Sequence, residues 1–353
     1  MKAAVYYGNR DVRIEHRPAP PSPGPGEVLL AVSRAGICGT DVSEYLHGPH
    51  VIPVHRPDPV TGYQGPVVLG HEFAGRVVAI GPGVADLSPG QRVASGAGVW
   101  CDACAWCRAG RPNLCARYYT LGLQADGGLA AYVRVPAKTC APVPDGVTEE
   151  AAALAQPLAV AMHAVTRSGV APHERLVVLG VGGIGALIVA AAVARGVRSL
   201  VAVDVDRHRL RVAEALGAAR VVHLGVDDPV RVVHDVTGGA GADVVIESAG
   251  VPASMELAPG LVRRGGRILQ VGLPQDRHPL DVRDLVLREV NLLTTVAHVC
   301  PTDLPEAIRL LATTDVAVHV LDRVIALDDL VDDGLLALAT RRAAGKIVVD
   351  PQA

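Results

Sequence analysis

Residues 175–185, with the sequence RLVVLGVGGIG, decide the fold of this chain. An apolar strand pattern runs directly into Gly180-Val181-Gly182-Gly183-Ile184-Gly185, a G-x-G-x-x-G turn that opens a helix. Gly180 permits the tight turn, Gly182 lets backbone N–H groups approach a pyrophosphate, and Gly185 lets the helix pack closely on the strand. The positive end of the helix dipole then faces the phosphates. The stretch therefore predicts a dinucleotide-binding strand–turn–helix unit, in which Gly183 and Ile184 also line the cofactor.

The same alternation of strand and helix continues on the C-terminal side of this turn. A helix through Arg195 is followed by SLVAVDVD, by a second helix to Leu216, and by the strand patterns DVVIESAG, RILQVGL and NLLTTVAHV. Alternating strands and helices build a parallel sheet that is covered on both faces. We therefore expect an α/β fold with a doubly wound Rossmann domain over residues 156–297.

Three further positions are assigned to the cofactor site. Asp204 ends the strand that follows the glycine turn, about 20 residues on, where a carboxylate binds the ribose hydroxyls. A carboxylate there would repel a 2′-phosphate, so NAD is expected rather than NADP. Arg209 either lies on the adenine ring or faces water on its helix. Val271, within RILQVGL, is the third position assigned to the cofactor site.

The first part of the chain has a different composition. Up to about Pro144 it is rich in Pro and Gly, with short valine-rich strand patterns over residues 27–32, 75–80 and 130–135 separated by turn signals. Such a pattern predicts an irregular, mostly antiparallel β domain. The final GKIVVDP is a strand that could return to this domain. We therefore expect a second domain formed by residues 1–155 and 298–353.

Four cysteines occupy a single short window, CDACAWCRAGRPNLC, at Cys101, Cys104, Cys107 and Cys115. Four thiolates at this spacing can surround one tetrahedral Zn²⁺, which then has no open position for a substrate. The expected role is structural. The alternatives are two disulfides in a secreted protein and a zinc ribbon that binds nucleic acid.

Composition narrows the possible partners. The chain has 353 residues and a formal net charge of -3, with no basic stripe interleaved with aromatic residues, which argues against nucleic acid. Its most apolar run, residues 176–194, is interrupted by four glycines and does not predict a membrane span. Seven cysteines without an export signal indicate the reducing cytoplasm.

The motifs together resemble the zinc-containing medium-chain alcohol dehydrogenases over essentially the whole chain. The matching segments are CGTD at residues 38–41, GHEFAGRV at residues 70–77, the four-cysteine window and VGGIG. Residues 44–73 look like the 2,3-butanediol dehydrogenase branch, which is close to the sorbitol dehydrogenases. The resemblance implies a GroES-like catalytic domain beside the Rossmann domain, two Zn²⁺ ions per chain, and NAD-linked interconversion of a secondary alcohol and its ketone.

The resemblance also implies a second, catalytic zinc held by Cys38, His71 and Gln156. Zn²⁺ in such an open site acts as a Lewis acid on the alcohol oxygen. Thr40 would hydrogen-bond the reacting oxygen. Glu72 would support the site as a nearby carboxylate or an occasional ligand; a buried salt bridge is the alternative role for it.

Two positions depart from the butanediol dehydrogenase pattern. Gln156 stands where that branch usually has Glu, and an amide leaves the zinc site one unit more positive, which should hold the metal less tightly. Some related sugar dehydrogenases have Gln there. Ser43 stands where the branch usually has His at the end of its proton relay, and a serine can pass a proton but cannot store one.

Several functions are therefore in competition. The first is a dehydrogenase of a vicinal diol or polyol, and the second is a sugar or cyclitol dehydrogenase, favoured by Gln156. A protein that binds NAD and zinc without activity is the non-enzymatic alternative. The apolar edge at residues 285–296 could pair across a two-fold axis, so a homodimer or homotetramer is expected.

Overall fold

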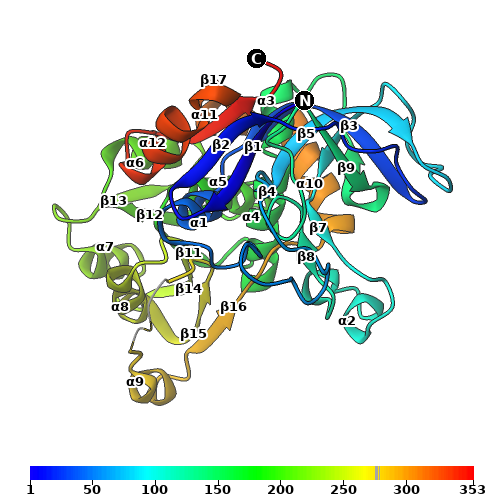
Figure 1. Cartoon of the computed structure of the whole chain (residues 1–353). Helices are drawn as coiled ribbons and strands as arrows, with labels where there is room; N and C mark the ends of the chain where they lie inside the picture. The colour runs from blue at the N-terminus through cyan, green and yellow to red at the C-terminus, as the bar shows by residue number, and fades with distance from the viewer. Residues whose placement is uncertain (275–276, 278) are drawn as a thin grey trace. The chain divides into compact units, whose positions relative to one another are not determined.

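The computed structural model describes residues 1–274, 277 and 279–353. Contacts between residues divide the chain into two compact units. Unit 1 comprises Met1–Ala159, Val299–Ala317 and Leu321–Ala353, and unit 2 comprises Val160–His298 and Val318–Val320. Each unit is described by itself below, with the element labels of Figure 1.

Unit 2 is built on a six-stranded sheet whose neighbouring strands are all parallel. Its strand order is β13-β12-β11-β14-β15-β16, which is the order 3-2-1-4-5-6 of a doubly wound dinucleotide-binding fold. The expected Rossmann domain is thus confirmed. The strands are β11 (Arg175–Leu179), β12 (Ser199–Asp204), β13 (Arg220–His223), β14 (Ala242–Glu247), β15 (Val262–Gln270) and β16 (Asn291–Thr294).

Both faces of this sheet are buried, which explains its nearly continuous aliphatic strands. Val177 and Val245 pack in a core with Val233 of α7 and Leu261 of α8, while Leu176 and its neighbours on the opposite face are equally inaccessible. The helices are α4 (Ala155–Ser168), which begins in unit 1, α5 (Gly183–Ala194), α6 (Arg207–Ala215), α7 (Pro229–Val236), α8 (Pro252–Leu261) and α9 (Val282–Leu287).

Unit 1 is mostly antiparallel, as expected, apart from the parallel pair β17–β18. Its main sheet has the order β10-β6-β5-β3-β18-β17, with β9 also paired to β3. The C-terminal strand does return to the first part of the chain, because β18 pairs with β3. The strands are β1 (Lys2–Gly8), β2 (Asp11–His16), β3 (Glu27–Gly36), β4 (Val67–Val68), β5 (Glu72–Ile80), β6 (Arg92–Ser95), β7 (Gly98–Val99), β8 (Tyr119–Thr120), β9 (Tyr132–Pro136), β10 (Cys140–Pro142), β17 (Leu321–Ala326) and β18 (Lys346–Asp350).

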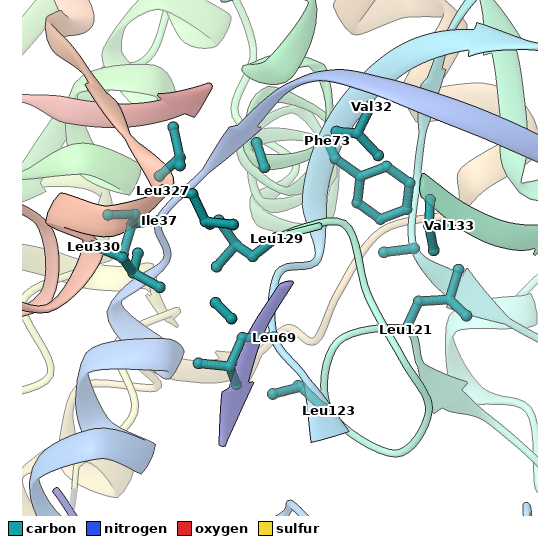
Figure 2. Packing of buried hydrophobic residues seen from close by; sticks show 14 of the residues in the cluster. Val32, Ile37, Leu69, Phe73, Leu121, Leu123, Leu129, Val133, Leu327 and Leu330 are labelled. Atoms are coloured by element: carbon teal, nitrogen blue, oxygen red, sulfur yellow. The ribbon is translucent and has the colours of Figure 1, made fainter. Parts of the chain in front are cut away.

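The helices of unit 1 are mostly short. The chain has a single Phe, Phe73, and it packs in the hydrophobic core of this unit near Val32 and Val133 (Figure 2). The helices are α1 (Gly39–His47), α2 (Ala105–Arg108), α3 (Glu149–Ala153), α10 (Cys300–Thr313), α11 (Val316–Val320), whose residues Val318–Val320 belong to unit 2, α12 (Leu336–Ala339), 3-10 turns at Pro112–Leu114, Ala137–Thr139 and Leu327–Asp329, and a π-helix at Leu330–Leu335.

The structure differs from the sequence-based expectations in a few elements. The hairpin β1–β2 and the edge strand β13 are not among the strands expected from the sequence. Residues 149–168, which lack turn residues apart from Pro157, form two helices, α3 and α4, separated at Leu154. Among the described residues, no helix is long and apolar enough to cross a membrane.

Candidate metal centres and dinucleotide turn

The four cysteines of the short window converge in unit 1. The Sγ atoms of Cys101, Cys104, Cys107 and Cys115 all lie within 4.8 Å of one another, and those of Cys104 and Cys107 are 3.6 Å apart. Sulfurs bound tetrahedrally at about 2.3 Å from one zinc would be about 3.8 Å apart. All four cysteines are free of disulfides, which excludes the disulfide alternative in this structure. The cluster therefore fits one closed zinc site.

Backbone N–H groups around the cluster favour thiolates. The N–H groups of Cys101 and Arg117 both point at Cys115 Sγ, at 3.3 Å. Hydrogen bonds from the backbone N–H groups of Cys107 and Ala116 lower the pKa of Cys104 to about 6, whereas burial raises the pKa of Cys107 to about 12. Zinc binds the deprotonated thiol, so backbone hydrogen bonds that stabilise a thiolate in this window favour metal binding.

A second cluster lies elsewhere in unit 1 and is open. Ligand atoms of Cys38, His71 and Glu72 lie within 4.8 Å of one another. His71 and Glu72 are buried, and Cys38 is partly exposed. A thiolate, an imidazole and a carboxylate are zinc ligands, and three protein ligands leave a tetrahedral ion one free position. The residues therefore fit a catalytic metal.

Two neighbouring strands bring this cluster together. Cys38 follows β3 and precedes α1, whereas His71 immediately precedes β5, and the register of these antiparallel strands places Gly36 opposite Glu72. Gly36 has no side chain, and a Cβ there would overlap the Glu72 carboxylate. The ladder between β3 and β5 thus fixes the positions of all three candidate ligands.

Asp41 connects the two strand ends electrostatically. Its Oδ2 accepts a hydrogen bond from the Cys38 backbone N–H at 2.9 Å, and its Oδ1 lies 3.6 Å from His71 Nδ1. Burial raises the pKa of Asp41. Burial opposes the charged form of His71, but Asp41, Cys38 and Glu72 together raise its pKa to about 10. Because Nδ1 faces Asp41, Nε2 of His71 is the nitrogen left for a metal.

The other predicted catalytic residues lie on α1 and α4. Thr40 is in the first turn of α1, with its Oγ1 3.7 Å from Cys38 Sγ. Ser43 is partly buried on the same helix. Gln156 is buried in the first turn of α4, within unit 1. Its role as a zinc ligand stays a prediction.

The glycine turn has the geometry expected from the sequence. Gly180 directly follows β11 with φ +82°, and Gly182 precedes α5 in extended conformation. A Cβ on Gly185 would overlap the carbonyl oxygen of Gly180. A Cβ on Gly182 would meet only the Arg209 guanidinium, at 3.6 Å. Gly182 therefore leaves its backbone open to a ligand, while Gly185 is required for packing.

The remaining predicted cofactor residues lie at the same edge of the unit 2 sheet. Asp204 ends β12 and Val271 follows β15, so both are at the carboxyl ends of parallel strands, beside the glycine turn. Asp204 is 4 % exposed. Its Oδ2 accepts from the Val181 N–H at 2.8 Å and its Oδ1 from the Asp206 N–H at 2.9 Å. Asp204 therefore also holds the turn itself.

Two residues near the open cluster were not assigned a role from the sequence. Asp41 belongs to the CGTD motif, but nothing in its spacing indicates that it faces His71. Lys346 begins β18 and forms a buried ion pair with Glu72. The signal in the sequence that could have indicated a role for Lys346 is the position of a lysine at the start of an otherwise apolar strand, KIVVD.

The chain is similar to known dehydrogenases in sequence and in structure. Residues 24–145 match the alcohol dehydrogenase GroES-like domain, and residues 183–313 match the zinc-binding dehydrogenase family. The sorbitol dehydrogenase of Bacillus subtilis is 32% identical over 99% of this chain and 97% of its own. The (R,R)-butanediol dehydrogenase of the same species is 34% identical over 99% and 100%. The crystal structure of 2R,3R-butanediol dehydrogenase from Bacillus subtilis has a TM-score of 0.90 at 33% identity, covering 99% of each chain.

Fold and sites together define a zinc-dependent NAD(P) dehydrogenase that acts on alcohols or polyols. The chain belongs to the zinc-containing medium-chain alcohol dehydrogenase family, and it is similar to both the sorbitol and the butanediol dehydrogenases.

Proposed function

We propose that the chain interconverts a secondary alcohol, either a vicinal diol such as 2,3-butanediol or a polyol, and its ketone, with NAD and two Zn²⁺ ions. The observation that carries this proposal is the open cluster of Cys38, His71 and Glu72. Residues 1–155 and 298–353 would form the catalytic domain and residues 156–297 the NAD-binding domain. Cys101, Cys104, Cys107 and Cys115 would hold the structural zinc.

Cys38 and His71 would hold the catalytic zinc, together with Gln156 or Glu72. Zinc when bound supplies a Lewis acid that lowers the pKa of the substrate hydroxyl. Asp41 orients the His71 ring, because a carboxylate facing Nδ1 fixes the tautomer that leaves Nε2 free.

Thr40 is the proposed first acceptor of the hydroxyl proton. Its Oγ1 is close to Cys38 Sγ and therefore to the metal position. The proton would leave through Ser43, one turn further along α1, to solvent. NAD, held by the glycine turn of residues 180–185 and by Asp204, would supply the hydride acceptor for oxidation of the alcohol.

NAD is the proposed cofactor because Asp204 places a carboxylate at the end of β12. Replacing Asp204 with Gly removes the charge that would repel a 2′-phosphate, and we expect the ratio of kcat/KM values for NAD and NADP to fall. Asp204→Asn is the matched control for the turn, since its amide oxygen still accepts from Val181. An unchanged ratio in both variants would show that another residue sets the preference.

A sugar or cyclitol dehydrogenase is the second candidate. Gln156 favours it, because some sugar dehydrogenases of this family have Gln where the butanediol branch has Glu. The inactive alternative predicts one zinc per chain, whereas the proposed function predicts two.

A substrate panel tests the proposed function. Stereoisomers of 2,3-butanediol, acetoin, sorbitol and myo-inositol are offered with NAD and NADP, and formation or loss of reduced nicotinamide is followed. A diol or polyol should give the highest kcat/KM, and removal of zinc by a chelator should abolish the activity. A higher value for the cyclitol would select the second candidate.

Two further expectations accompany the proposal. Four free thiols that bind zinc need a reducing compartment, which favours the cytoplasm. β16 is an edge strand on which Leu292 is 46% exposed, and Val296, two residues after the strand, is 53% exposed. Such an apolar edge favours pairing in a homodimer or homotetramer.

A further inference from the structure

Lys346 is a buried lysine in direct contact with the open cluster. It is 6% exposed, and the Glu72 carboxylate is 1% exposed. Its Nζ donates to Glu72 Oε2 and, at 2.8 Å, to the backbone carbonyl of Ile37, the residue before Cys38. One ammonium group therefore joins the ends of the two strands that carry the candidate ligands.

Strand pairing puts this ammonium there. β18 pairs antiparallel with β3, with Val348 opposite Gly36, and the Ile37 N–H donates to the Ile347 carbonyl at 3.1 Å. Continuing this register by two residues places Lys346 opposite Cys38. Since β3 also pairs with β5, the carboxylate of Glu72 is reached from the other side.

The choice of lysine is unusual for this chain. Only three of its 33 basic residues are lysines, at positions 2, 138 and 346. Lysine presents a compact ammonium, whereas arginine presents a planar fork that needs more room. A small buried cation is therefore what this position requires.

Charge explains why a cation is needed beside the metal site. Cys38 as a thiolate, Asp41 and Glu72 bring up to three negative charges together, and the two carboxylates are buried. Zinc supplies two positive charges and Lys346 the third, while His71 as a metal ligand is neutral. Buried charges are tolerated when they are paired. Without Lys346, the metal would be the only cation available to Glu72.

We propose that Lys346 is a positioning residue that competes with the catalytic zinc for the Glu72 carboxylate and so keeps the substrate's coordination position available. This inference rests on the proposed function, because it needs a metal at Cys38 and His71. Glu72 has one oxygen bound to Lys346 while its ligand atom lies within 4.8 Å of those of Cys38 and His71. A small rotation of the carboxylate would transfer it from one cation to the other.

Zinc release separates this role from a purely structural one. Zinc-loaded protein is mixed with a chromogenic chelator, and the phase that belongs to the catalytic metal is identified as the one absent from Cys38→Ser. In Lys346→Met we expect this phase to slow by about 10-fold, at the low end of the effects that partners of metal ligands have. The freed carboxylate binds the metal directly, so kcat should fall as well.

Glu72→Gln completes a double-mutant cycle. If Lys346 acts through Glu72, the Lys346 substitution should change the release rate by less than about twofold in the Glu72→Gln background. Lys2→Met is the matched control, since it removes a lysine–carboxylate pair of unit 1, with Asp328, at the surface. If Lys346→Met does not fold, Lys346→Gln, which keeps a donor without the charge, replaces it.

Each outcome has a defined meaning. Slower release in Lys346→Met that disappears in the double variant supports the inference. Unchanged or faster release, or the same 10-fold slowing in both backgrounds, overturns it. Absence of any Cys38-dependent phase in the wild-type protein would overturn the proposed function itself, and the release of the four-cysteine zinc serves as the internal reference.

Discussion

Cys38 and Asp41 show that one residue can both stabilise the local backbone and form part of the candidate metal site. Asp41 accepts the Cys38 N–H with one oxygen, and its other oxygen lies 3.6 Å from Nδ1 of His71, so the same carboxylate starts α1 and lies beside the imidazole. Glu72 pairs with Lys346, and its carboxylate also lies within 4.8 Å of the ligand atoms of Cys38 and His71. At this scale the sequence identified Cys38, His71 and Glu72, and it left open whether Glu72 is a ligand or part of a salt bridge.

Replacing Cys38 by Ser should abolish turnover and leave NAD binding intact. The thiolate is a candidate ligand in unit 1, whereas the glycine turn belongs to unit 2. The NAD dissociation constant, measured by fluorescence or calorimetry, should change by no more than about twofold, as expected for independent sites. Retained turnover would refute the assignment of Cys38.

Replacing Gln156 by Glu should tighten the catalytic zinc. A carboxylate adds a negative charge to the site that the neutral amide lacks. Chelator titration measures the effect, with the four-cysteine zinc as internal reference. Equal or faster loss of the metal would rule out a ligand role for Gln156.

The glycine turn shows what one element contributes. Its strand, turn and helix are contiguous, and its three glycines serve different needs: Gly180 adopts φ +82°, Gly182 leaves the backbone open, and Gly185 packs on Gly180. Asp204 adds a hydrogen bond from β12 to the Val181 N–H. A local motif of this kind is readable from sequence because its residues are neighbours along the chain.

Gly185→Ala and Gly182→Ala form a matched pair that separates packing from binding. The Gly185 variant should lose stability by about 1–3 kcal/mol, since its Cβ has no room beside Gly180. The Gly182 variant should keep its stability, because its Cβ would meet only Arg209, and it should bind NAD more weakly. Denaturant unfolding and NAD titration give the two readouts. Equal stability losses in the two variants would contradict this division of roles.

At the scale of the whole molecule, the two edges of the unit 2 sheet are the candidate surfaces for pairing with another chain. β16 and β13 are the edge strands of this sheet. An exposed edge with apolar side chains is a template for pairing with another chain. Three apolar side chains at these edges are exposed: Leu292 in β16, Val296 after β16, and Val226 after β13.

Leu292→Lys should reduce the molar mass of the assembly in solution if β16 is the proposed pairing edge. A charge on that strand would be buried against its counterpart in a second copy. Val226→Lys, at the opposite edge, is the matched control and should leave the mass unchanged. Light scattering coupled to size-exclusion chromatography measures both; dissociation by the Val226 substitution alone would assign the interface to the other edge.

The sequence by itself determined the Rossmann unit, the four-cysteine window, and Cys38 and His71 as members of the open cluster. Each of these signals is short-range, because it consists of a fixed spacing of glycines or cysteines, or of a motif that adjoins a strand. Only the tertiary structure decided that Lys346 binds Glu72, 274 positions away, and that Asp41 faces His71. Those contacts depend on β18 returning beside β3 and on the register of β3 with β5. Strand order and register arise from packing of the whole sheet, and no local pattern in the chain encodes them.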